Sequence, residues 1–183
     1  AFAGLSIDRQ SPDFEKLLLF DQIFGMGALG SMHSRLFALR EETGLFYTIN
    51  GSTIAGIGEQ PGMVSIVTIV SNDRLKEAEK AIKGVVDTVA PTITEQELIE
   101  ARYAVVNSLV NNFQSNRATV NAFLFLDKYD LPADFFDKRN QTLSKVTLQE
   151  VIDTAAKYLN TDHMITVKVG RAEEQKENKE DGK

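Results

Sequence analysis

The sequence predicts an α+β fold in which helices pack on one face of a mainly antiparallel sheet. Strand-like segments lie in the first part of the 183-residue chain and one more closes it, while helical patterns fill the remainder. Strands and helices do not alternate as they do in a parallel sheet, so a doubly wound α/β fold is disfavoured. These two observations carry the assignment of the fold class.

Four segments have the composition of strands. Residues 2–8 alternate small and large apolar side chains, and residues 45–57 are rich in bulky side chains. A turn over residues 58–62 leads to the β-branched run 63–70, which we expect to return antiparallel to the preceding strand. Residues 164–169 form the last predicted strand, and we expect it to lie beside the first one in the sheet.

Helix starts are marked by residues that cap them. Ser11 is a predicted N-cap with Pro12 at the first helical position, and most of the circumference of that helix is apolar. Thr94 with Glu97 and Thr147 with Glu150 form capping boxes, in which each side chain bonds the other residue's backbone amide. The predicted helices cover residues 12–24, 32–43, 72–89, 95–109, 116–126, 135–143 and 148–159.

The composition is that of one globular domain, which we assign to residues 1–170. Residues 171–183 are almost entirely polar, and we expect a disordered tail. The net charge of −6 argues against a nucleic-acid surface, and no apolar run is long enough to span a membrane. The absence of cysteine excludes disulfides and thiolate chemistry. The strand-like start at Ala1 without an initiator Met suggests a fragment of a longer protein.

We expect the stretch from residue 25 to residue 51 to contain a helix that turns sharply into a strand, and we call this turn the corner. Ser31 is a candidate N-cap for this helix, and Gly44 lies where a helix ends in the left-handed conformation. Arg40 belongs to the last helical turn and Tyr47 to the strand that follows, so the corner could bring the two together. From these positions alone, a helix-dipole role for the Arg and a packing role for the Tyr are the better explanations.

Gly25, Gly27 and Gly30 spell the dinucleotide-binding pattern G-x-G-x-x-G. That fingerprint requires a strand before the first glycine, because the phosphates lie between a strand end and a helix N-terminus. Here a helix precedes it, so we reject nucleotide binding and interpret the glycines as a mobile or tightly turned loop.

No metal site is expected within this domain. The only histidines, His33 and His163, are far apart and belong to no H-E-x-x-H or H-x-x-E-H motif. A catalytic zinc usually takes three protein ligands.

The corner sequence SRLFALREETGLFYTI resembles a block of the zinc peptidases of the pitrilysin, insulin-degrading enzyme and mitochondrial-processing-peptidase family (inverzincins), in their non-catalytic C-terminal domain. The long helix after Thr94 and the closing segment from Leu131 to Gly170 also resemble that family, so the similarity covers nearly all of the first 171 residues. The matching corner residues are Ser34, Arg35, Leu36, Phe37, Arg40, Glu41, Gly44, Leu45, Tyr47 and Ile49.

The resemblance favours a functional role for Arg40 and Tyr47 over the structural one. It implies that Arg40 and Tyr47 reach into the zinc site of a homologous partner domain, on the same chain or another subunit, and bind the carbonyl oxygen of a peptide substrate. It also implies that the glycine loop at Gly25, Gly27 and Gly30 lies near the substrate chamber, although the family's fuller glycine motif is absent. A fixed cation and a phenolic hydroxyl suit stabilisation of an oxyanion.

The resulting hypothesis is a substrate-binding domain that is inactive alone and holds no cofactor, within a longer zinc metalloendopeptidase. Peptide substrate and the zinc-bearing domain are the expected partners, with neither nucleic acid nor membrane among them. One alternative is a structural, non-peptidase subunit of the same fold, and the presence of Arg40 and Tyr47 weighs against it. A small-molecule-binding module has only the glycine loop in its favour.

Overall fold

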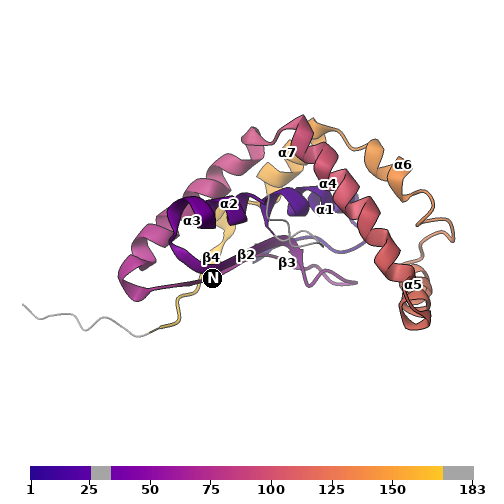
Figure 1. The fold of residues 1–183 in the computed structure, drawn as a ribbon, viewed down its shortest axis with the longest axis horizontal. Coiled ribbons are helices and arrows are strands. Elements are labelled where there is room, and N and C mark those ends of the chain that lie inside the picture. The colour runs from indigo at the N-terminus through magenta and orange to yellow at the C-terminus, as the bar shows by residue number, and fades with distance from the viewer. Residues whose placement is uncertain (26–33, 171–183) are drawn as a thin grey trace, which may run out of the picture.

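The computed structural model describes residues 1–25 and 34–170. Gly27, Gly30, Ser31, His33 and the expected tail over residues 171–183 lie outside the described residues. Helices arch over one face of an antiparallel sheet, and the opposite face carries none of the described helices (Figure 1). The α+β fold with helices on one face of the sheet is therefore confirmed.

The sheet has the strand order β2-β3-β1-β4, and every neighbouring pair is antiparallel. Phe2 pairs with Thr166, so the first and last strands are neighbours, as expected. The last strand is much shorter than the predicted one, because only two of its residues pair with β1 in the ladder. The strands are β1 (Phe2–Leu5), β2 (Phe46–Ala55), β3 (Met63–Val70) and β4 (Ile165–Thr166).

Seven α-helices and four 3₁₀ turns complete the described residues. The α-helices are α1 (Phe14–Phe24), α2 (Arg35–Thr43), α3 (Leu75–Val89), α4 (Glu95–Ser108), α5 (Asn116–Lys128), α6 (Arg139–Ser144) and α7 (Leu148–Tyr158). The 3₁₀ turns are η1 (Asn72–Arg74), η2 (Ala90–Thr92), η3 (Leu109–Phe113) and η4 (Thr161–His163).

Three predicted helix starts are wrong. The N-cap of α1 is Asp13, and Ser11 instead accepts a hydrogen bond from the Asp13 amide. The N-cap of α2 is Ser34 in place of the predicted Ser31, and the Ser34 side chain accepts a hydrogen bond from the Phe37 amide. The helix predicted from residue 135 begins only at Arg139, since residues 133–138 form turns. In each region several polar residues could cap a helix, and the local pattern does not choose among them.

Helix α1 is the centre of the core. It contacts strand β2 as well as helices α4 and α7, and eight of its eleven residues are buried. Phe20 and Phe24 are fully buried and stack with ring centroids 5.4 Å apart. The expectation that most of the circumference of this helix is buried is therefore confirmed.

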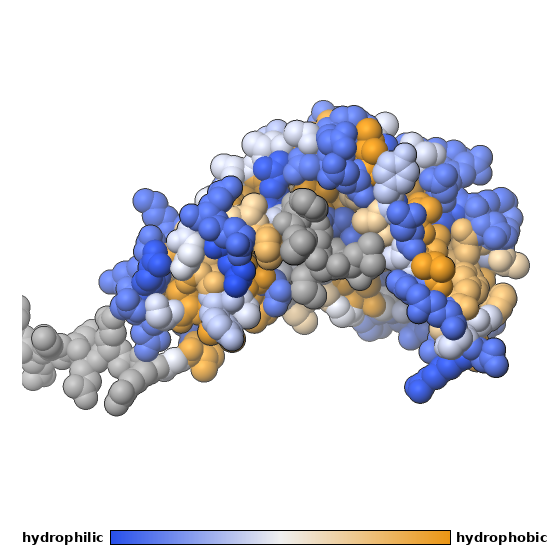
Figure 2. All heavy atoms as spheres, in the orientation of Figure 1, coloured by the Kyte–Doolittle hydropathy of each residue, from blue (hydrophilic) through white to orange (hydrophobic). Residues whose placement is uncertain are grey.

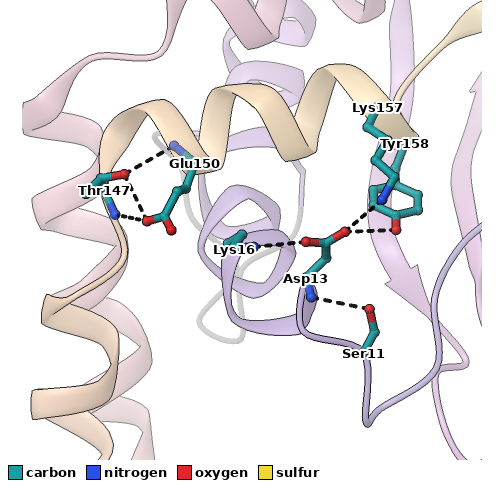
Figure 3. Close-up of polar contacts among 7 residues, drawn as sticks. All are labelled: Ser11, Asp13, Lys16, Thr147, Glu150, Lys157 and Tyr158. Atoms are coloured by element: carbon teal, nitrogen blue, oxygen red, sulfur yellow. Dashed lines mark hydrogen bonds and ion pairs between the residues drawn. The ribbon is translucent and has the colours of Figure 1, made fainter.

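A polar cluster around Asp13 fastens the start of α1 to the end of α7 (Figure 3). The Asp13 carboxylate accepts hydrogen bonds from Lys16 Nζ at 2.9 Å and from Lys157 Nζ and the Tyr158 hydroxyl at 3.0 Å each. The hydrogen bond from Lys16, followed by those from Lys157 and Tyr158, lowers the pKa of Asp13 to about 2, although partial burial opposes the shift.

This shift makes part of the stability depend on pH. An unfolded aspartate has a pKa near 4, so the stabilisation from Asp13 is complete above that pH and is lost as the pH falls towards 2. Because the lysine partners are partly exposed, we expect a contribution of only about 1 kcal/mol. Melting temperatures of the wild type and Asp13→Asn should differ by about 2–4 °C at pH 6 and converge near pH 2.

The exposed Asp137→Asn supplies the control, because it makes the same chemical change outside the cluster. A wild-type advantage over Asp13→Asn that stayed constant from pH 6 to pH 2 would contradict this account of the carboxylate.

Candidate functional site

The corner between α2 and β2 is set by Gly44. This residue has φ +59° and ψ +18°, and its amide donates to the Arg40 carbonyl oxygen at 2.9 Å. A residue with a Cβ would adopt this left-handed conformation only at a cost. The chain thus leaves the last turn of α2 and enters β2 within three residues.

The corner brings Arg40 and Tyr47 together. Arg40 Nε donates a hydrogen bond to the backbone carbonyl oxygen of Tyr47 at 3.2 Å. Nη1 of the same guanidinium forms an ion pair with Glu41. Arg40 therefore fixes the strand at the position of Tyr47 through the backbone, while its side chain stays 38% exposed.

A β-bulge decides where the Tyr47 side chain lies. Phe46 pairs with Val70 and Thr48 with Ile69, so the register shifts by one residue at Tyr47. Phe46 and Ile49 are buried although they are three positions apart, which a regular strand with a period of two does not allow. Tyr47 and Thr48 consequently both face away from the core, and Tyr47 is 77% exposed.

The face of the sheet that no described helix covers carries several exposed apolar side chains. β3 contributes Met63, Val67 and Ile69 to it, all of them exposed, and Leu5 pairs with Met63 on the neighbouring strand. Exposed apolar side chains that gather on one face commonly mark a contact with another protein unit. Tyr47 lies on the adjacent strand β2, at the edge of this face.

Gly25 has a packing role that its place in a glycine pattern does not reveal. It is the C-cap of α1, and a Cβ built on it would lie 1.9 Å from the backbone oxygen of Gly51 in β2.

Beside this contact, the buried Asp21 carboxylate accepts hydrogen bonds from the Ser52 hydroxyl at 3.0 Å and the Thr53 hydroxyl at 3.1 Å. Burial raises the pKa of Asp21 to about 6 despite these donors.

The start of the glycine segment is therefore packed tightly against the sheet. The expected loop role of Gly27 and Gly30 lies outside the described residues. The helix before Gly25 is confirmed, so the strand that nucleotide binding would require is missing.

A metal centre requires several ligating side chains that lie close together. Among the described residues no group of three or more His, Cys, Asp or Glu side chains could hold a metal ion. His163 is exposed in η4. None of the helices in the same part of the chain is long and apolar enough to cross a membrane.

Comparison with known proteins assigns the family. Residues 1–105 match the family model described as the peptidase M16 inactive domain. The chain belongs to the peptidase M16 family. No curated protein matches the sequence.

Solved structures share the fold of this M16 inactive domain. The peptidase M16 inactive domain from Pseudomonas fluorescens is 24% identical over 89% of this chain, with a TM-score of 0.67. A protease from Helicobacter pylori is 12% identical over 89% of the chain, with a TM-score of 0.73. The inactive peptidase domain of a proposed zinc protease from Bordetella parapertussis is 15% identical over 90% of the chain, with a TM-score of 0.71.

The M16 inactive domain is shorter than several of the structures it matches. It covers 38% of the Pseudomonas fluorescens chain and 38% of the Helicobacter pylori chain, but 87% of the Bordetella parapertussis chain. The family match over residues 1–105 confirms the resemblance to the non-catalytic domain of the zinc peptidase family.

Proposed function

We propose that this M16 inactive domain binds peptide substrate together with a zinc-bearing domain of a longer zinc metalloendopeptidase. In this proposal the Tyr47 hydroxyl and the Arg40 guanidinium donate hydrogen bonds to the substrate carbonyl oxygen held in the partner domain. The domain alone does not hydrolyse peptides, and any zinc belongs to the partner.

The observation that carries the proposal is the bulge at Tyr47. It turns the side chain towards the uncovered side of the sheet, at the residue whose backbone carbonyl oxygen accepts a hydrogen bond from Arg40 Nε. A tyrosine retained only for packing would be expected to bury its ring, whereas this ring is largely exposed. The exposed apolar side chains of β3 offer a surface on which a partner domain can dock.

The Tyr47 hydroxyl and the Arg40 guanidinium differ in the contacts that each must break before it can bind a substrate. The Tyr47 hydroxyl makes no hydrogen bond among the described residues and the residue is exposed, so the hydroxyl is available to a substrate. Arg40 already pairs with Glu41, but an exposed ion pair of this kind contributes only about 0–1 kcal/mol. A substrate carbonyl with developing negative charge can therefore compete for the guanidinium, and charge-assisted hydrogen bonds are the stronger ones.

Arg40→Ala in the full-length protein tests the proposal. We expect kcat for peptide hydrolysis to fall about 100-fold, the loss typical for removal of one oxyanion donor. Zinc content should not change, because Arg40 lies in this domain and not among the metal ligands. Arg117→Ala, which removes an exposed Arg from α5, is the matched control.

Melting temperature must be measured alongside, since Arg40 also holds the Tyr47 carbonyl. A folded Arg40→Ala protein that hydrolyses peptide at the wild-type rate would return Arg40 to a purely structural role.

A further inference from the structure

A cavity of about 500 Å³ lies between the start of α1, the 3₁₀ turn η3, helix α5 and the segment leading into α6. It shares no residue with the corner at Arg40 and Tyr47. Apolar side chains gather at the surface of this end of the molecule (Figure 2). Two arginines, Arg9 and Arg139, line the cavity together with five aromatic rings. The four rings that surround the Arg9 guanidinium belong to Phe14, Phe125, Tyr129 and Phe135.

Arg9 is buried, and no ion pair joins it to a carboxylate among the described residues. Only 8% of the residue is exposed, and the guanidinium carbon lies 3.8 Å from the centroid of the Phe14 ring. Three further aromatic rings of the lining have centroids within 5.9 Å of it. The Nε atom of Arg9 is buried and has no hydrogen-bond partner among the described residues.

Arg139 is the second buried cation. It is 3% exposed and pairs through Nη2 with Glu15, while Nη1 is buried with no partner among the described residues.

Burial lowers the pKa of Arg9, with Glu15 opposing and Arg139 reinforcing the shift. A guanidinium nevertheless remains charged at neutral pH. Two cations therefore share one carboxylate, which leaves one positive charge in excess.

The remaining lining does not neutralise that charge. The described lining residues include no Asp or Glu, and their polar members beyond the arginines and Tyr129 are Ser108 and three asparagines at positions 111, 112 and 121. Burial of a charge without a compensating partner is costly, so an anion that entered the cavity would remove this cost.

We infer that this cavity binds a carboxylate carried on an apolar body. The planar fork of a guanidinium matches a carboxylate in two parallel hydrogen bonds, and the aromatic rings suit an apolar group attached to it. The volume falls within the range of about 300–1,000 Å³ that is usual for small-molecule sites. A free organic acid and the C-terminal residue of a peptide both carry such a carboxylate on an apolar body.

Calorimetric titration of the 183-residue chain with matched ligands tests the inference. We expect 3-phenylpropionate to bind at least tenfold more tightly than its neutral amide, 3-phenylpropionamide, because only the acid neutralises the arginines. N-acetylphenylalanine reports on a peptide C-terminus, and its affinity relative to 3-phenylpropionate distinguishes the two sources of carboxylate. Equal binding of acid and amide, or no saturable binding of either acid, would overturn the inference.

Variants connect the binding to the cavity. Arg9→Met keeps an apolar side chain against Phe14 but removes the charge, and it should weaken the acid at least tenfold. Arg117→Met removes an exposed Arg from α5 and should leave the affinity unchanged. If Arg9→Met does not fold, Ala118→Leu decides, since it fills the cavity without touching either arginine. A folded variant of either kind that binds the acid like the wild type contradicts the assignment.

Discussion

In the full-length protein, Tyr47→Phe is expected to lower kcat for peptide hydrolysis about 100- to 1000-fold, while the melting temperature stays within about 1 °C of the wild type. The rate loss is what removal of one positioned oxyanion donor typically costs. Stability should be preserved because Tyr47 is 77% exposed and the substitution deletes only the hydroxyl. Surface substitutions of this kind usually change stability by less than about 0.5 kcal/mol.

The kinetic signature separates this role from simple substrate binding. An interaction made only in the transition state lowers kcat and kcat/KM together, whereas loss of uniform binding raises KM alone. Tyr103→Phe is the matched control, because Tyr103 is 65% exposed on α4 and lies away from the corner. Wild-type turnover in a stably folded Tyr47→Phe protein would remove the hydroxyl from the proposed mechanism.

Gly25→Ala is expected to destabilise the domain by about 3 kcal/mol, at the upper end of the range for an overpacked core. The new methyl group would lie 1.9 Å from the Gly51 backbone oxygen, and neither α1 nor β2 can shift cheaply. Gly51 itself is enclosed by Leu36 and Phe24, so it has no room to retreat. For a domain of this size the melting temperature should fall by roughly 6–12 °C.

Gly84→Ala provides a control with the opposite sign. Gly84 is an exposed residue inside α3, and nothing lies within 4 Å of a Cβ built on it. Replacement of a helix-interior glycine by alanine stabilises by up to about 1 kcal/mol, which corresponds to a gain of roughly 2–4 °C. If Gly25→Ala melted at the wild-type temperature, the close contact between α1 and β2 would not exist in solution.

The candidate site was predictable in part. The sequence pattern places Arg40 in the last turn of a helix and Tyr47 in the next strand, and the structure has both there. The pattern does not reveal that the contact runs through the Tyr47 carbonyl, nor that a bulge turns the ring outward. A bulge depends on how β2 pairs with β3, some twenty residues away, and no residue type at position 47 or 48 marks it.

The burial of Arg9 and Arg139 could not be predicted from the sequence. Arg9 follows a predicted strand and Arg139 falls within a predicted helix, and charged residues at such positions are ordinarily exposed. Their burial results from residues more than one hundred positions apart, since Glu15 on α1 pairs with Arg139 at the start of α6. Apolar periodicity reports which side of one element is buried, and it says nothing about a cation enclosed by several elements.

The sequence by itself determined the features that depend on neighbours within about four residues. The capping boxes at Thr94 and Thr147 start α4 and α7 where predicted, and the β-branched run 63–70 coincides with β3. Tertiary structure alone decided the bulge at Tyr47 and the contact between Gly25 and Gly51. Those features arise where segments distant in the chain meet, because close packing there leaves a single backbone geometry that fits.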